Sequence, residues 1–259
     1  MNLACETLGL SNLFSFHSEI NSDRIKLETN SYLLTEPSTF DELIEIFKFR
    51  FSIFGVSAVD DVQLDFDSFD RYCDHLIVKE KSTGDIVGVY RFIASNKNKK
   101  FYSSSEFSLN SFLKLPGNKL ELGRASVCPM HRNGQVIDLL WKGIGLMAKK
   151  YNARYLFGCS SLMSTDPADA QSLYFKLKNN DSIDTELNVF PVGKYAFTFK
   201  PHSILEENFD VPPLLKSYLM AGAKVVGLPA FDEEFGCFDF LTVLDLNEIS
   251  SSFKRRYFN

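Results

Sequence analysis

Three charged side chains lie within apolar segments that are expected to form strands of a central sheet. Arg91 is part of VGVYRFI, and Glu121 and Arg124 are part of LELGRASV. A charge inside a buried strand costs free energy unless it is paired or used for function. These three residues therefore form either a structural ion pair across the sheet or part of a functional site.

Several well-known catalytic and metal-binding motifs are absent from the sequence. The segment 158–162 (GCSSL) lacks the closing glycine of GxSxG. Asp65 begins a segment like a calcium loop that has no glycine at its sixth position. Cys128-Pro-Met-His131 has no second half for a zinc site, and the HxxxxD motif of glycerolipid acyltransferases does not occur. We therefore expect no metal and no cofactor.

The composition is that of an ordinary globular protein. Of the 259 residues, 45% are hydrophobic, and the net charge of -5 argues against a general nucleic-acid binder. Five cysteines without a CxxC pair are typical of reduced thiols in a cytoplasmic protein. No apolar run is long enough for a transmembrane helix. The 25 phenylalanines indicate either a Phe-rich core or an apolar tunnel for a ligand.

Strands and helices alternate along the chain without repeats or linkers, which predicts a single α/β or α+β domain. We expect a loose segment over 1–24, one domain over 25–245 and a basic, aromatic tail over 246–259. Ser38 or Thr39 is expected to cap a helix that includes Arg50. The other expected helices cover 103–115, 136–151, 167–177 and 212–221, and the expected strands cover 25–36, 75–79, 85–94, 119–128, 155–159, 224–228 and 237–245.

The charged residues belong to an ordered series that spans roughly residues 30–245. The series is Arg50, Phe54, Asp67-Ser-Phe-Asp70, Cys73-Asp-His75-Leu, Gly88-Val-Tyr-Arg91, Phe101-Tyr-x3-Glu106-Phe107, Glu121-Leu-Gly-Arg124, Arg132-x-Gly134, Leu140-Trp141 and Gly158-Cys-Ser-Ser161. It resembles the amino-acid N-acyltransferases that use acyl-carrier-protein thioesters. These include the ornithine-lipid N-acyltransferases, often labelled hemolysin-like, and share the GNAT acetyltransferase fold.

The same core residues resemble acyl-homoserine-lactone synthases more distantly, whereas segment 212–241 is similar to the ending of the N-acyltransferases alone. The resemblance implies a GNAT-like mixed, mostly antiparallel sheet flanked by helices. It also implies transfer of a long acyl chain from acyl-carrier protein, or from acyl-coenzyme A, to the amine of an amino acid, as in bacterial lipid biosynthesis. The alternatives are a lactone synthase and a non-catalytic protein that perturbs membranes or binds a carrier.

For this reaction, Glu121 is the candidate general base and Arg124 a second catalytic residue. Burial in an apolar strand brings a carboxylate closer to what proton removal at neutral pH requires. Arg124 is three residues further on, and this odd offset places it on the opposite face of a regular strand. Both serve one site only if the strand bulges, for which Gly123 is the plausible position. Otherwise Arg124 has a different role.

The resemblance also assigns candidate binding residues. Those for the acceptor are Arg50, Phe54, Asp67, Asp70 and Arg91. Arginine suits a carboxylate, and the two aspartates either bind the acceptor's ammonium or hold the arginines in place. Those for the donor are Ser126, Val127, Arg132 and Gly134. The loop from Arg132 lacks the second glycine of the coenzyme A pyrophosphate motif, which fits the single phosphodiester of a carrier protein.

The acceptor itself is not readable from the sequence. Ornithine would need an additional carboxylate near the site, which Asp65, Asp67, Asp70 or Asp232 can supply, whereas glycine would need none. An acidic carrier protein would need a basic patch to dock on. Lys97, Lys99 and Lys100, Lys149 and Lys150 with Arg154, and Lys254–Arg256 are candidates, and the last of these can instead contact a membrane surface peripherally.

Overall fold

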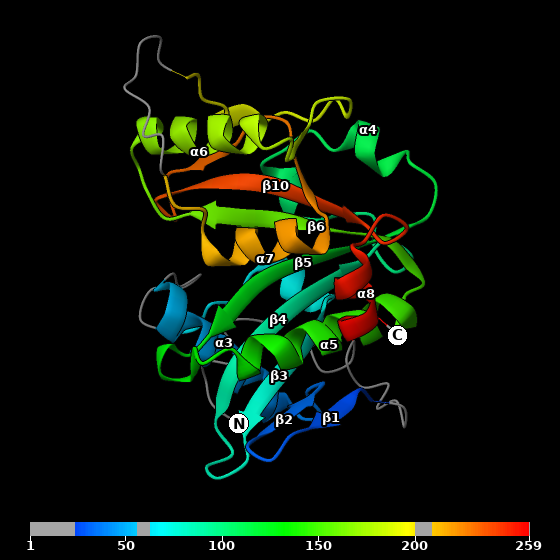
Figure 1. The fold of residues 1–259 in the computed structure, drawn as a ribbon. Coiled ribbons are helices and arrows are strands. Elements are labelled where there is room, and N and C mark those ends of the chain that lie inside the picture. The colour runs from blue at the N-terminus through cyan, green and yellow to red at the C-terminus, as the bar shows by residue number, and fades with distance from the viewer. Residues whose placement is uncertain (1–23, 56–62, 200–208, 259) are drawn as a thin grey trace. The chain divides into compact units, whose positions relative to one another are not determined.

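The computed structural model describes residues 24–55, 63–199 and 209–258 (Figure 1). It divides into two compact units, each made of two chain segments. Unit 1 comprises the described residues of 1–93 and 123–147, and unit 2 those of 94–122 and 148–259. Segment 1–23, expected to be loose, lies outside the described residues. The single domain over 25–245 stays a prediction.

Unit 1 contains an antiparallel set of strands. β1 (Lys26–Glu28), β2 (Tyr32–Thr35), β3 (Asp74–Glu80) and β4 (Ile86–Ala94, whose last residue belongs to unit 2) pair in chain order. The expected single strand over 25–36 is therefore wrong, because it is a hairpin. The Thr29 side chain accepts a hydrogen bond from the Tyr32 N–H at 3.0 Å and closes the turn between β1 and β2.

Two helices cover opposite faces of β3 and β4. On one face, α3 (Phe40–Phe54) packs against Ile77 and Val89. On the other, α5 (Gln135–Lys150) packs against Gly88, where an added Cβ would lie 2.7 Å from Val136. Because side chains alternate along a strand, residues two positions away from Ile77 and Val89 in the regular part of the hairpin also face α3. His75 and Arg91, paired in register, therefore face α3 as well.

The expected capping of α3 is confirmed, since the Thr39 hydroxyl accepts from the Glu42 N–H, and Gly55 ends the helix with a φ of 70°. Two 3-10 turns complete unit 1, η2 (Ser68–Arg71) and η4 (Pro129–His131). Asp67 begins η2 with a reciprocal capping box, in which its carboxylate accepts from the Asp70 N–H and Asp70 accepts from its N–H.

Unit 2 is organised around β6 (Ala153–Leu162) and β10 (Cys237–Asp245), which pair antiparallel over eight residue pairs. β5 (Asn118–Val127) begins in unit 2, where it pairs parallel with β6, and ends in unit 1. β8 (Lys224–Val226) and β9 (Ala230–Asp232) pair antiparallel with β10, and β7 (Ile183–Asp184) pairs parallel with β8. Most of the strand pairs in the described residues are thus antiparallel, as expected.

One face of this sheet carries α6 (Pro167–Asn179) and α7 (Pro213–Ala221), which pack on a core that contains Phe238 and Phe240. Many phenylalanine rings pack on one another there, which accounts for part of the unusual phenylalanine content. The helix expected over 167–177 is confirmed, with Asp166 as its cap and proline in its first turn.

The other face carries the segment expected to be one helix over 103–115. This expectation is wrong, because the segment forms η3 (Tyr102–Ser105) and α4 (Asn110–Leu113). Phe107 forms an isolated bridge with Pro191, which pulls the chain between them out of helical geometry. The Phe112 ring seats α4 on Tyr155 and Phe157 of β6.

The remaining described elements are η5 (Gly193–Tyr195) and α8 (Ser251–Tyr257). α8 shows that the basic, aromatic tail is helical. Among the residues that the structure describes, no helix is both long enough and apolar enough to cross a membrane.

Gly158 provides a test of this packing, because β6 approaches β5 closely at this residue. An added Cβ would lie 2.1 Å from the backbone oxygen of Leu122, which cannot move without disturbing the sheet. Gly158→Ala should lower the free energy of unfolding by about 2 kcal/mol or more. At the control position, Gly123→Ala, the nearest atom is 3.8 Å away. Equal denaturant midpoints for both variants would contradict the close approach.

Candidate functional site

A buried cluster of arginines and aspartates lies on the α3 face of unit 1. Arg50, near the end of α3, binds Asp70 of η2 through two hydrogen bonds of 2.7 and 3.1 Å. Its Nε donates to Asp65 at 2.9 Å. Arg91 of β4 donates to the Asp70 carboxylate at 3.2 Å and to the Asp67 carboxylate at 2.7 Å. Each aspartate is thus placed between guanidinium groups.

Arg124 joins the same cluster through its partly exposed guanidinium. Its Nη2 donates to Asp67 at 3.2 Å, and its Nε lies 3.1 Å from the Asp65 carboxylate. Its φ of 50° is in the left-handed region, which costs strain for a residue other than glycine. A bulge was considered at Gly123 as the condition for Glu121 and Arg124 to share a site. The unusual backbone angle lies at Arg124 itself, whose side chain is held by two aspartates.

The acceptor-binding residues predicted from the resemblance are all in this cluster or beside it. The Phe54 ring, at the end of α3, lies with its centroid 6.0 Å from the Arg124 guanidinium. Arg50 and Arg91 expose 0% and 2% of their side chains. This is the geometry expected if the aspartates hold the arginines in place, the second of the two roles considered for them. Contact of these arginines with an acceptor stays a prediction.

Asp70 is the centre of the cluster and stays ionised there. Burial alone would raise its pKa, but the charges of Arg50 and Arg91 outweigh this and hold the pKa well below its ordinary value. Conversely, burial would lower the pKa of Arg91, and the aspartates raise it well above its ordinary value.

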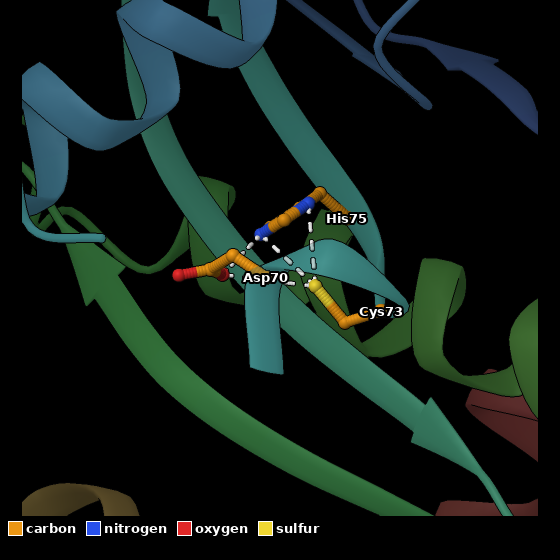
Figure 2. Close-up of side chains that lie close together, drawn as sticks. All are labelled: Asp70, Cys73 and His75. Atoms are coloured by element: carbon orange, nitrogen blue, oxygen red, sulfur yellow. Dashed lines mark hydrogen bonds and ion pairs between the residues drawn. The ribbon is translucent and has the colours of Figure 1, made fainter. Parts of the chain in front are cut away.

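Asp70, Cys73 and His75 have spacings that a metal ion can accept, as Figure 2 shows. The Cys73 Sγ lies 3.7 Å from Asp70 Oδ1 and 3.6 Å from His75 Nε2. However, Asp70 is already bound by two guanidinium groups, and burial raises the pKa of the Cys73 thiol well above its ordinary value. A cation here would displace an arginine and require a thiolate, so these residues do not fit a metal.

The predicted donor-binding residues lie where β5 ends and α5 begins, in unit 1. The Arg132 side chain is exposed, and its Nε donates to the Val127 carbonyl at 3.2 Å. Exposed Gly134 has a φ of 86° and directly precedes α5. Ser126 is buried, and its hydroxyl donates to the Arg124 carbonyl. Arg132 and Gly134 thus lie just before a helix N-terminus, the general setting for a phosphate, and the donor-binding role of the four residues stays a prediction.

Glu121 occupies a different setting, in the part of β5 that belongs to unit 2. Its carboxylate is 3% exposed and accepts the N–H of Tyr102 at 2.7 Å. It also accepts the N–H and the hydroxyl of Ser103 at 2.7 and 2.6 Å. These bonds, from the first residues of η3, fix the orientation of the carboxylate.

A second group of buried acids, Glu106, Asp232 and Asp239, lies on the same face of unit 2. Asp239 was missed, Glu106 was in the ordered series without an assigned role, and Asp232 was considered only as an additional carboxylate for ornithine. Glu106 follows η3 directly, and its Oε2 accepts from the Cys159 thiol at 3.4 Å. Asp239 of β10 accepts from Ser161 at 2.6 Å. Asp232 of β9 caps the next turn by accepting the N–H of Glu234. Asp239 lies in the apolar run CFDFL, so the rule that singled out Glu121 applies to it too.

Glu106 and Asp239 have pKa values shifted upward. Burial and, after it, the nearby charges of Asp239 and Asp232 together raise the pKa of Glu106 to about 9. Burial, followed by repulsion from Asp232, also raises the pKa of Asp239. Burial raises the pKa of the Cys159 thiol well above its ordinary value. The group therefore holds at least one proton near neutral pH, in contrast to the ionised Asp70 of unit 1.

Comparison with known proteins places these residues in a family context. Residues 49–142 match the family model described as acetyltransferase (GNAT) domain, which confirms the predicted fold class. The chain is 32% identical over 210 residues to the L-ornithine N(alpha)-acyltransferase of Brucella abortus (strain 2308), covering 75% of each chain. It is 33% identical over 208 residues to that of Rhizobium meliloti (strain 1021), covering 74% of this chain and 70% of the relative.

Solved structures give weaker matches. MesI, a CoA-dependent acyl-homoserine lactone synthase, has a TM-score of 0.48 and 13% identity, with 84% of this chain and 88% of MesI covered. The acyl-homoserine lactone synthase LasI has a TM-score of 0.46 and 11% identity, with 92% of this chain and 96% of LasI covered.

The Asp70 ion pairs predict an acid-sensitive contribution to stability. Because the pKa of Asp70 is lowered on folding, this contribution is complete above the ordinary aspartate value and is lost as the pH falls below it. Asp70→Asn should cost about 3–5 kcal/mol at pH 7 by leaving buried arginines partly unpaired. The difference in free energy of unfolding between wild type and Asp70→Asn should become smaller as the pH is lowered. Urea unfolding at several pH values measures this difference.

The control for this prediction is Asp85→Asn, which alters an exposed carboxylate in the β3–β4 turn of the same unit. It should leave the midpoint almost unchanged at every pH. If Asp70→Asn behaves like Asp85→Asn, the buried ion pairs do not stabilise unit 1.

Proposed function

This chain belongs to the L-ornithine N(alpha)-acyltransferase family, and from this premise we propose that it acylates the α-amine of ornithine. The proposed donor is a long-chain fatty acyl thioester of acyl-carrier protein. The match to the Brucella relative over three quarters of each chain is the observation that carries this proposal. The product is an N-acyl amino acid with a free carboxylate.

The reaction joins an amine to a thioester carbonyl. The α-ammonium of the acceptor loses one proton, and its nitrogen then forms the amide bond and loses a second proton while the carbon–sulfur bond breaks. The leaving thiolate takes up a proton, so that one proton is released overall for each ammonium acylated. A protein can assist by removing the ammonium proton and by orienting the two reactants.

We assign the removal of this proton to Glu121, directly or through a water molecule. A general base must be held within hydrogen-bond reach of the proton that it abstracts. The bonds from Tyr102 and Ser103 supply such rigidity, because they come from the backbone and from a short side chain. They also tie η3 to β5, so that Glu121 has a structural role beside its proposed catalytic one.

The arginine–aspartate cluster of unit 1 is assigned a positioning role. Arg50 exposes none of its side chain, whereas Arg124 exposes 11%. We therefore assign contact with a reactant to Arg124, held by Asp65 and Asp67, and support of those aspartates to Arg50 and Arg91. A guanidinium in this position can bind the acceptor carboxylate or stabilise a developing oxyanion.

The loop from Arg132 to Gly134 supports a carrier-protein donor. A carrier protein presents one phosphodiester, and a single exposed arginine beside a helix N-terminus suits such a group. A second glycine would let the backbone approach the pyrophosphate of coenzyme A closely, and this loop lacks that glycine.

Glu121→Gln tests the assignment of the base. Purified protein is supplied with ornithine and either acyl-carrier-protein or coenzyme A thioesters, and products are quantified by mass spectrometry. Wild type should form N-acylornithine preferentially from the carrier protein, and the variant should lose about 100-fold or more in kcat. Activity within a few-fold of wild type across pH would show that Glu121 is not the base.

Ser103→Ala is the matched control, because it removes one hydrogen bond to Glu121 and keeps the carboxylate. It should retain most of the activity. Thermal unfolding of both variants separates the two roles of Glu121. If both lose activity in proportion to their loss of stability, Glu121 only anchors η3.

A further inference from the structure

The buried acids of unit 2 differ from those of unit 1 in having no cationic partner. Glu106, Asp232 and Asp239 are each at most 4% exposed. Among the described residues, their bonded partners are hydroxyl, thiol and backbone N–H groups and, for Glu106 and Asp239, each other's carboxyl group, and no ion pair includes them. A buried carboxyl group needs a proton, a cation or hydrogen-bond donors, and the raised pKa values of Glu106 and Asp239 show that the donors here do not suffice to keep both ionised.

One atom of this group lacks the partner that a buried acceptor needs. The Glu106 carboxyl has one oxygen, Oε2, in contact with Cys159, while its other oxygen, Oε1, is buried and has no hydrogen-bond partner. Carboxylate oxygens of Glu106 and Asp239 and the Cys159 sulfur lie within 4.8 Å of one another. In the free protein, a proton shared with Asp239 satisfies this pair. A ligand that brings a positive charge and hydrogen-bond donors can take the place of that proton.

We propose that Glu106 and Asp239 bind the side-chain ammonium of the amino-acid acceptor. This inference rests on the proposed function and names the residues that select a cationic acceptor. An ammonium group supplies a positive charge and several hydrogen-bond donors, the two features that a pair of buried carboxyl groups requires. Glu106 Oε1 and the Asp239 carboxylate would each accept one of its hydrogens, and Asp232 would add its charge.

The aspartates of unit 1 cannot serve this purpose as well. Asp65, Asp67 and Asp70 are already bound to arginines, and an ammonium there would have to displace a guanidinium. Of the four residues that the sequence analysis considered as an additional carboxylate for ornithine, Asp232 alone lies in unit 2, near Glu106 and Asp239.

The pair also lies close to the proposed base. The Ser103 hydroxyl donates to Glu121 and lies 3.4 Å from the Cys159 sulfur, which in turn contacts Glu106. Only two side chains thus separate Glu121 from Glu106. Cys159 is partly exposed, so this row of side chains is not sealed from solvent. An acceptor with its α-amine at Glu121 would extend its side chain along Ser103 and Cys159.

Ammonium binding at this pair is linked to a proton. With a pKa raised to about 9, Glu106 is protonated at neutral pH in the free protein, and a bound ammonium displaces that proton. The groups that face Glu106 are Tyr102, Cys159, Asp232, Asp239 and Tyr195. None of them is cationic, so a bound ammonium is the group that favours ionisation. The preference for a cationic acceptor should therefore rise as the pH increases from 7 to 9.

Glu106→Gln and Asp239→Asn test the proposal with ornithine and norvaline, which lacks the side-chain amine. Each variant should raise the KM for ornithine by about 10- to 100-fold, as expected for loss of a charged hydrogen bond. Any loss with norvaline should be much smaller than the loss with ornithine. The ratio of kcat/KM for ornithine to that for norvaline should rise with pH in wild type relative to the same ratio in Glu106→Gln. Dividing the two ratios cancels the different titrations of the two acceptors' amines, because both proteins receive the same acceptors.

Glu234→Gln is the control, because it removes an acid that is close in sequence to Asp232 but 66% exposed. Equal losses for ornithine and norvaline, or no loss for either, would overturn the proposal. A stoichiometric metal ion that is present in wild type and absent from Glu106→Gln, measured by mass spectrometry, would also overturn it.

Isothermal titration calorimetry measures the binding of ornithine and of norvaline in the absence of acyl donor. It thus tests the ammonium site separately from the proposed acyl transfer. Selective ornithine binding without acyl transfer would support this site while contradicting the proposed function.

Discussion

A carboxylate that leaves water on folding must find a cation, a proton or hydrogen-bond donors, and the arrangement of this protein follows from how each buried acid meets that requirement. In unit 1, arginines from α3 and β4 surround Asp70 and keep it ionised. This ties the helix, the η2 turn and the sheet to one another. In unit 2, donors from η3 surround Glu121. Glu106 instead depends on a proton.

These three solutions suit three different tasks. Ion pairs with good geometry hold a rigid frame, as for Arg50, which has no exposed side chain. Backbone hydrogen bonds fix a carboxylate without neutralising its charge, which suits a proposed base such as Glu121. A buried carboxyl group that is protonated because no cation lies nearby can lose that proton when a cation binds. The proposed acceptor site uses this last property.

Much of the fold was predictable from local patterns. The capped helix α3, the β3–β4 hairpin and the proline-initiated helix α6 follow from alternation and capping residues alone. The structure of segment 103–115 was not predictable in this way, because the bridge from Phe107 to Pro191 joins positions far apart in the chain. The cluster around Asp70 was predictable as a set from the ordered series of residues. Glu106 was part of that series but received no role, because its contacts with Cys159 of β6 and Asp239 of β10 join positions far apart in the chain.

The most direct test of the account is the position of the acyl group on the product. Purified protein, acyl-carrier-protein thioester and ornithine are incubated together, and the product is fragmented in a tandem mass spectrometer. The account predicts acylation of the α-nitrogen with the side-chain amine unmodified, because that amine is held as an ammonium at Glu106 and Asp239. Acylation of the side-chain nitrogen, or no acylornithine at all, would contradict it.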